Sequence, residues 1–185
     1  MKSKYVEIEI GSKSLPDPSA IYYIGNGIKY SNVLKELKVH NEFNMNRSTN
    51  FKGYQLKYFA DGLKCSNSLQ ILSFCNFHID TVEAQYIAHG VKHSKQLKQL
   101  RMDNNDISTN GVKHITQALQ YMNKLKVLEL TNNSIATEKL KHIVQFVKHS
   151  DTLQVLNLTN NDIVAKGLNN IFEALKCSKT LQTRS

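Results

Sequence analysis

The hydrophobic and polar residues of this chain recur in the same order every 28 residues along much of its length. LQILSFCNFHI begins at Leu69, LKQLRMDNNDI at Leu97, LKVLELTNNSI at Leu125 and LQVLNLTNNDI at Leu153, and a further start, LQTRS, stands at Leu181. In each full unit the fourth and sixth positions are apolar with a polar residue between them, the period of a strand with one buried face. We therefore predict a short strand near the start of every unit.

The second half of each unit has the period of a helix. Val112, Ile115 and Leu119 are spaced i, i+3, i+7, and the same spacing begins again at Leu140 and at Leu168. Strands that are joined by returning helices pair in parallel. The sequence therefore predicts an α/β fold with one parallel sheet and one helix for each strand.

Earlier units follow the same order with more variation. IGNGIKYSNVLKELKV (24–39) aligns without a gap with IAHGVKHSKQLKQLRM (87–102), which places a start at Leu34. The next interval is 35 residues, and its surplus lies in the polar, Asn-rich segment 40–50, which we expect to be an enlarged loop. YVEIEI places Tyr5, Ile8 and Ile10 at the apolar positions of a first unit, 29 residues before Leu34. In that register Glu9 stands in the fifth position.

We expect one domain, 1–185, with repeats that start near residues 5, 34, 69, 97, 125 and 153 and a partial repeat at 181. Because the last unit stops after a few residues, two interpretations stay open: a fragment of a longer protein, or a natural chain whose end frays or self-associates.

The ninth position of the later units is Asn105, Asn133 or Asn161. An amide side chain has both donors and an acceptor, so these residues can satisfy the backbone groups of neighbouring turns in a ladder. Phe77 occupies this position in the Leu69 unit, so the ladder should break there or be filled differently.

The motif LxxLxLxxNxI, followed by a helix every 28 residues, resembles the ribonuclease-inhibitor-like class of leucine-rich-repeat proteins. It is also similar to NOD-like receptor repeats and to bacterial leucine-rich-repeat effectors. The resemblance implies a right-handed horseshoe solenoid with a parallel concave β-sheet and convex α-helices, in which stacking buries each unit's apolar face. It also implies a non-enzymatic module that binds a partner protein on its concave face, such as an effector or an innate-sensor region. Alternatives are a GTPase-activating protein of the Ran-directed type and a basic binder of anionic surfaces.

The candidate binding surface consists of outward-facing strand positions, where an apolar column runs beside a column of mixed charge. Arg101 is the expected anchor, because arginine is enriched in binding hot spots. The candidate residues are Lys38, Ile71, Ser73, Cys75, Gln99, Arg101, Asp103, Val127, Glu129, Val155 and Asn157.

Composition bears on the solubility and the cellular compartment of the protein. The chain has 185 residues, 41% hydrophobic and 21% charged, which indicates a soluble, folded protein without a membrane-spanning stretch or a signal peptide. Three widely spaced cysteines, Cys65, Cys75 and Cys177, fit a reducing compartment, so we expect a cytoplasmic protein, or one delivered into a host cytosol if it is a bacterial effector. Cys75 is expected to be an accessible thiol.

The net charge of +9 raises the question of anionic partners. Lysines fall on the predicted helices, which favours a solvated outer face over a nucleic-acid footprint: Lys92, Lys113, Lys141, Lys148, Lys166 and Lys176. His89 and His93 have an i, i+4 spacing that suits a metal, but no third ligand accompanies them. We predict no catalytic residues, no cofactor and no metal, and the oligomeric state stays open.

Overall fold

Each sequence unit forms one strand and one helix in the computed structural model, which describes residues 4–10, 19–41, 53–178 and 180. The strands are β1 (Lys4–Ile10), β2 (Leu34–Asn41), β3 (Ile71–Cys75), β4 (Gln99–Arg101), β5 (Val127–Glu129) and β6 (Val155–Asn157). The helices are α1 (Ser19–Tyr30), α2 (Gly53–Cys65), α3 (Thr81–Lys92), α4 (Thr109–Leu119), α5 (Thr137–His149) and α6 (Ala165–Cys177).

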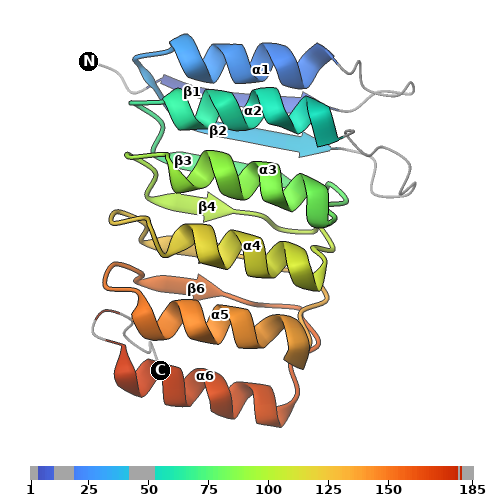
Figure 1. Ribbon diagram of the computed structural model, residues 1–185, viewed down its shortest axis with the longest axis vertical. Helices are drawn as coiled ribbons and strands as arrows, with labels where there is room; N and C mark the ends of the chain where they lie inside the picture. Colours follow the sequence, from blue (N-terminus) through green and yellow to red (C-terminus); the bar gives the residue numbers. More distant parts are fainter. Residues whose placement is uncertain (1–3, 11–18, 42–52, 179, 181–185) are drawn as a thin grey trace.

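The strands form one parallel sheet in the order of the sequence, β1 to β6. All six helices lie on one side of this sheet, and consecutive helices are neighbours along the stack (Figure 1). The predicted α/β fold with a parallel sheet is confirmed. We call the side of the sheet that faces away from these helices the open face.

Leucines of the strands and apolar residues of the helices meet in the core between the two layers. Leu100 and Leu128 have no solvent exposure, and Val112 of α4 is 2% exposed. Because the same positions recur in each unit, every inner unit buries its apolar side chains against the unit before and the unit after it.

The last unit departs from this rule. Leu168 of α6 is 46% exposed and Phe172 is 56% exposed, whereas the equivalent residues of α5, Leu140 and Val144, are buried. The helical spacing that begins at Leu168 therefore does not mark a fully buried face in this unit. In the described part of the chain, α5 is the only helix that neighbours α6, so the far side of α6 is not covered by another unit there.

The first strand has a different register from the one that its sequence predicts. Val6 is paired with Leu37 and Glu7 with Lys38, so Glu9 does not lie beside Lys38. YVEIEI alternates with a period of two, and a shift of two residues keeps that alternation of polar and apolar positions, although it moves Tyr5 out of the first position of the unit. The hydrophobic pattern thus allows both registers, and the prediction is wrong by two residues.

Two sequence features lie largely outside the described residues. The enlarged segment 40–50 begins within β2, and its remainder, from 42 on, is not described; neither is the repeat start at 181. Among the described residues there is no helix whose length and hydrophobicity would let it span a bilayer.

Candidate functional site

An interrupted apolar strip crosses the open face. Ile71, Gln99, Val127 and Val155 are in-register neighbours on β3, β4, β5 and β6. Val155 is 47% exposed, and the other three are half-buried. Parallel pairing at identical spacing thus turns the third position of each unit into one continuous line across the sheet.

A column of mixed charge runs beside this strip, and its members are Lys38, Ser73, Arg101, Glu129 and Asn157. The Nε atom of Arg101 lies 3.1 Å from the Oε2 atom of Glu129. The Arg101 guanidinium also donates a hydrogen bond to the Gln99 side-chain oxygen at 3.2 Å. The expected anchor is therefore held in place by two neighbours on the same face.

Other candidate residues of this face also serve the fold. The Oδ1 atom of Asp103 accepts a hydrogen bond from the backbone N–H of Thr131 at 2.7 Å. The Asn157 side chain accepts from the backbone N–H of Thr159 at 3.0 Å. Ser73 is only 3% exposed. Asp103 and Asn157 are thus engaged by backbone groups, and Ser73 is buried, so these three side chains are less free to contact a partner than an exposed side chain would be.

The expectation for Cys75 is wrong, because its thiol is not accessible. Cys75 is 7% exposed and ends β3, a five-residue strand whose last residue is paired with His40 of β2. In the later units the strands have three residues, so the equivalent position lies beyond the strand. Burial raises the pKa of the Cys75 thiol, which favours the uncharged and less reactive form.

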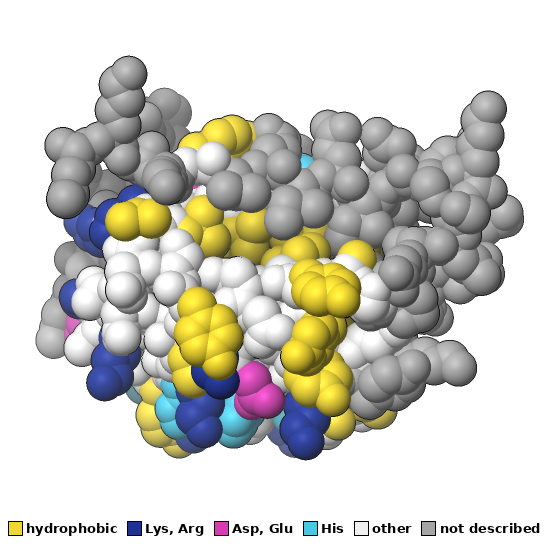
Figure 2. All heavy atoms as spheres, turned by 90° about the horizontal axis from the view of Figure 1, so that it is seen from above, with side chains coloured by type: hydrophobic (Ala, Val, Ile, Leu, Met, Phe, Trp, Pro, Cys, Tyr) yellow, Lys and Arg dark blue, Asp and Glu magenta, His cyan; other side chains and the backbone are white. Residues whose placement is uncertain are grey.

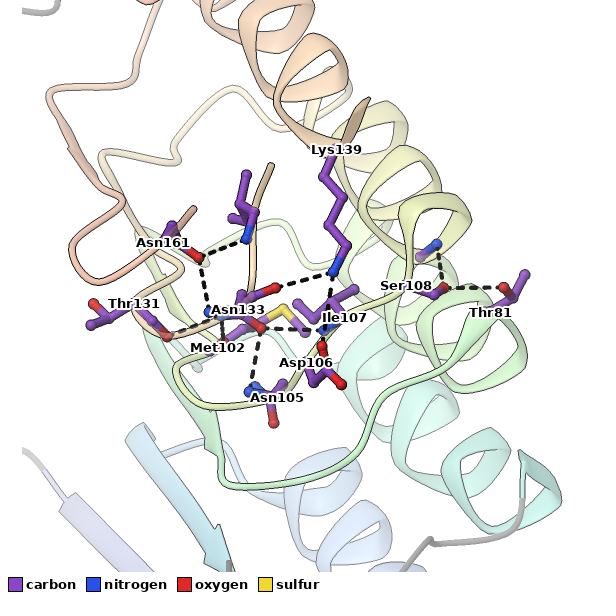
Figure 3. A network of polar contacts seen from close by, with 12 residues as sticks. Thr81, Met102, Asn105, Asp106, Ile107, Ser108, Thr131, Asn133, Lys139 and Asn161 are labelled. Carbon is purple, nitrogen blue, oxygen red and sulfur yellow. Dashed lines mark hydrogen bonds and ion pairs between the residues drawn. The ribbon is translucent and has the colours of Figure 1, made fainter. Parts of the chain in front are cut away.

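Three asparagines link the turns that follow the strands (Figure 3). The Asn161 side chain accepts a hydrogen bond from the backbone N–H of Asn133 at 2.9 Å and donates to the carbonyl of Leu130 at 2.9 Å. Asn133 in turn donates to the carbonyl of Met102 at 2.8 Å and accepts from the N–H of Asn105 at 3.3 Å. The ladder satisfies backbone groups that the turns remove from water.

An aromatic cluster takes the place of the ladder at Phe77. The backbone N–H of Phe77 donates to the Asn105 side chain at 2.8 Å. The phenyl ring itself has no donor or acceptor with which to continue the ladder. It stacks on Phe74 with ring centroids 4.1 Å apart, and Phe74 lies 5.4 Å from Phe59. Apolar packing therefore fills the position in this unit.

An asparagine in each later turn adopts a left-handed backbone conformation, and the turns after β4 and β5 each hold a second such residue, Asp106 and Ser134. Asn76, Asn104, Asn132 and Asn160 have φ angles of 66°, 58°, 54° and 54°. Asparagine tolerates this region better than most residues. This role of the eighth position was not predicted from the sequence, although an asparagine recurs there in every full unit from Leu69 onward.

Tyr5 is a further surface residue that sequence reasoning missed. It is 46% exposed, and its hydroxyl accepts a hydrogen bond from the Lys38 ammonium at 2.8 Å. The predicted register assigned Tyr5 to a core leucine position. Tyr5 could have been expected at this exposed position only if the register of β1 had been predicted with a shift of two residues.

Aromatic side chains also reach the surface on the helix side. Tyr22 of α1 contacts Tyr23 and Tyr58 edge-on, with ring centroids 5.5 and 4.9 Å apart. Figure 2 looks onto the α1 end of the stack and shows hydrophobic side chains at this surface beside lysines and histidines. Within the described ranges, no group of three or more His, Cys, Asp or Glu residues is arranged to hold a metal ion.

Comparisons with solved structures identify the fold. The C-terminal domain of tropomodulin from Caenorhabditis elegans superposes with a TM-score of 0.66 and 14% identity, covering 85% of this chain and 92% of that one. A domain described as leiomodin-1 actin-binding site 2 superposes with a TM-score of 0.60 and 20% identity, covering 90% of each chain. No protein-family model matches the chain, and no curated protein matches it.

These two domains belong to a different family from the ribonuclease-inhibitor-like class, so the resemblance drawn from the repeat is corrected. The physical reason is that a 28-residue period with apolar strand and helix positions specifies one strand and one helix in each unit. Any family built from such units needs the same core positions, and the period alone does not separate one family from another.

Proposed function

We propose that this protein is a non-enzymatic binding module that holds a partner protein on the open face of its sheet. The observation that carries the proposal is the in-register pair of columns, the strip Ile71–Gln99–Val127–Val155 beside the Arg101–Glu129 ion pair. An apolar strip beside fixed charges combines desolvation with orientation, as protein interfaces do.

Two features make this face ready to bind. The Arg101 side chain is already held by Glu129 and Gln99, so little rotamer freedom remains to be lost when a partner docks. We infer further that the sheet curves in the horseshoe manner, with the open face concave, which would let a partner contact several strands at once.

The partner that we propose to test first is actin. Support comes from the leiomodin-1 domain, whose description names it an actin-binding site and whose fold this chain shares. With 20% identity the likeness concerns the fold, so the residues of the open face have to be tested directly.

The test compares two double variants of equal charge change. Arg101→Ala with Val127→Glu alters the open face, and Gln145→Glu with Lys148→Ala makes the same net change at exposed positions of α5. Binding of purified actin is measured by surface plasmon resonance for monomers and by co-sedimentation for filaments, and far-UV circular dichroism confirms that each variant is folded.

We expect the open-face variant to lose actin binding and the α5 variant to keep it. No actin binding by the unmodified protein would remove actin as the partner. In that case affinity capture from a lysate with mass spectrometry supplies the ligand, and a partner retained by the Arg101→Ala, Val127→Glu variant would contradict the open-face assignment.

A further inference from the structure

Helices α3 and α4 are neighbours on the side of the sheet opposite to the open face (Figure 1), and the side chains between them line a groove. Its wider part is a cavity of about 490 Å³ lined by both helices, including His89, Lys92 and His114. A second cavity of about 450 Å³ lies where the helices end, lined by His93, Ser94 and Lys124 among others. Lys92 and Tyr121 line both cavities, and we call the two together the α3–α4 groove.

The groove is lined by basic side chains. Its ionisable side chains, besides Tyr121, are His89, Lys92, His93, Lys95, His114 and Lys124, and no Asp or Glu is among the described residues that line it. Elsewhere on the helix side lysines have acidic neighbours, as in the ion pairs Lys141–Glu138 and Lys176–Glu173. The groove therefore differs from a solvated face of alternating charge.

Aromatic and imidazole contacts position these groups without the help of a carboxylate. The Lys92 ammonium lies 3.9 Å from the centroid of the Tyr121 ring, between the two cavities. The rings of His89 and His93 meet edge-on with centroids 5.2 Å apart, and Nε2 of His114 lies 3.1 Å from Nε2 of Gln85. A cation over an aromatic ring keeps its free N–H groups for another acceptor.

The buried hydroxyl of Ser94 differs from the equivalent hydroxyls of other units. In other units the serine that follows the helix accepts a hydrogen bond from the backbone N–H three residues later: Ser31 from Leu34 at 3.0 Å, Ser66 from Leu69 at 3.2 Å and Ser150 from Leu153 at 3.2 Å. Ser94 lines the second cavity, is 5% exposed, and its buried Oγ has no hydrogen-bond partner. An unsatisfied buried hydroxyl is rare and needs an explanation.

We propose that the α3–α4 groove binds a ligand that carries several phosphate groups, with Lys92 between two phosphates and His89, His93 and Lys124 around them. Phosphate oxygens accept charge-assisted hydrogen bonds from ammonium and imidazole groups. Lys92 lines both cavities, Lys95 and Lys124 line the second, and His89 and His114 line the first, so donors for phosphate oxygens lie on either side of Lys92. Both cavities are open to solvent, and their volumes are within the range that small-molecule ligands occupy. The phosphates can belong to a soluble molecule or to a lipid headgroup.

The pKa of His93 offers a test that distinguishes binding in the groove from general attraction to a basic protein. Partial removal from water lowers the pKa of His93, and His89 of α3, Lys64 of α2 and Lys92 lower it further. A bound polyanion opposes these positive neighbours and should raise the pKa of His93. Nuclear magnetic resonance of its imidazole during a pH titration, with and without ligand, measures this directly.

The binding test uses myo-inositol hexakisphosphate as the soluble probe, in isothermal titration calorimetry. Vesicles of phosphatidylcholine with phosphatidylinositol 4,5-bisphosphate are the lipid probe, in co-sedimentation. The groove variant is Lys92→Gln with Lys124→Gln. Its matched control is Lys148→Gln with Lys166→Gln, which removes the same charge from exposed positions of α5 and α6.

We expect the groove variant to weaken binding by about tenfold or more, and the control to change it by no more than about twofold, because only the groove makes direct charge-assisted bonds. Vesicle binding that the soluble probe displaces assigns the phosphates to a lipid headgroup, and binding of the soluble probe alone assigns them to a free molecule. Equal weakening in both variants, an unchanged His93 pKa, or no binding of either probe would overturn the proposal. Because both variants keep the open face, actin binding is scored separately.

Discussion

The Nε atom of Arg101 on β4 lies 3.1 Å from the Oε2 atom of Glu129 on β5, its in-register neighbour. The side chains are 34% and 24% exposed, so water still screens the attraction. The pair therefore fixes two side chains on the open face without contributing much to stability.

A double-mutant cycle should give a small coupling energy for this pair. Arg101→Ala, Glu129→Gln and the double variant, compared by urea unfolding, should show a coupling of about 0.2–1 kcal/mol that decreases with added salt. Lys141 and Glu138, whose side chains are 56% and 73% exposed, provide a more solvated control pair that should couple more weakly. A coupling that did not respond to salt would show that the contact is packing and not charge.

Asn133 should be far more sensitive to substitution than an exposed asparagine. Asn133→Ala removes the donor to the Met102 carbonyl and the acceptor for the Asn105 N–H, leaving backbone groups without partners. We expect a loss of about 1–3 kcal/mol in the free energy of unfolding. Asn169→Ala, at an exposed position of α6, should change it by less than about 0.5 kcal/mol. Equal urea midpoints for the two variants would contradict a supporting role for the ladder.

The core could be predicted from the sequence because every inner unit has the same surroundings. Leu100 and Leu128 occupy one position of the repeat, and both are fully buried. The prediction failed where the surroundings change. Among the described residues, Leu168 has the same pattern but a neighbouring helix on one side only, and β1 keeps its pattern when its register shifts by two residues. Periodicity describes a repeat's interior and carries little information about its ends.

The candidate site was predictable as a set of columns but not as a set of contacts. Identical spacing places Arg101 beside Glu129, yet it does not tell that Asp103 turns to the Thr131 backbone. The α3–α4 groove could not be predicted from the sequence for a related reason. Lys92 was expected on a solvated face, and the repeat pattern does not show that Lys124 lines the same groove or that no Asp or Glu is among the described residues that line it.

Cys65 and Cys75 should differ strongly in their reactivity toward iodoacetamide. Cys65 is exposed, whereas Cys75 is buried and burial raises the pKa of its thiol. The thiolate is the reactive form, so at neutral pH the native protein should be alkylated at Cys65 first. Peptide mass mapping over time, repeated in urea, measures both rates. Labelling of Cys75 as fast as that of Cys65 in the native protein would show that β3 opens readily at its end.

Gly62 and Gly27 test how closely the first helices pack. A Cβ atom on Gly62 of α2 would lie 2.2 Å from the carbonyl oxygen of Gly25 in α1, which is backbone and cannot rotate away. Gly62→Ala should therefore push the two helices apart and cost about 1–3 kcal/mol. A Cβ on Gly27, also in α1, would meet nothing within 4 Å. Gly27→Ala should gain about 0.5–1 kcal/mol, because alanine loses less backbone entropy in a helix.

Urea unfolding compares the stabilities of the two variants. Both substitutions add one methyl group to a helix, and they differ only in the atoms that this group contacts. If the Gly62→Ala midpoint equals or exceeds that of the unmodified protein, α1 and α2 do not depend on their close approach. Opposite shifts for the two substitutions would show that the N-terminal end of the stack is held by direct backbone contact between helices, which only glycine permits at Gly25 and Gly62.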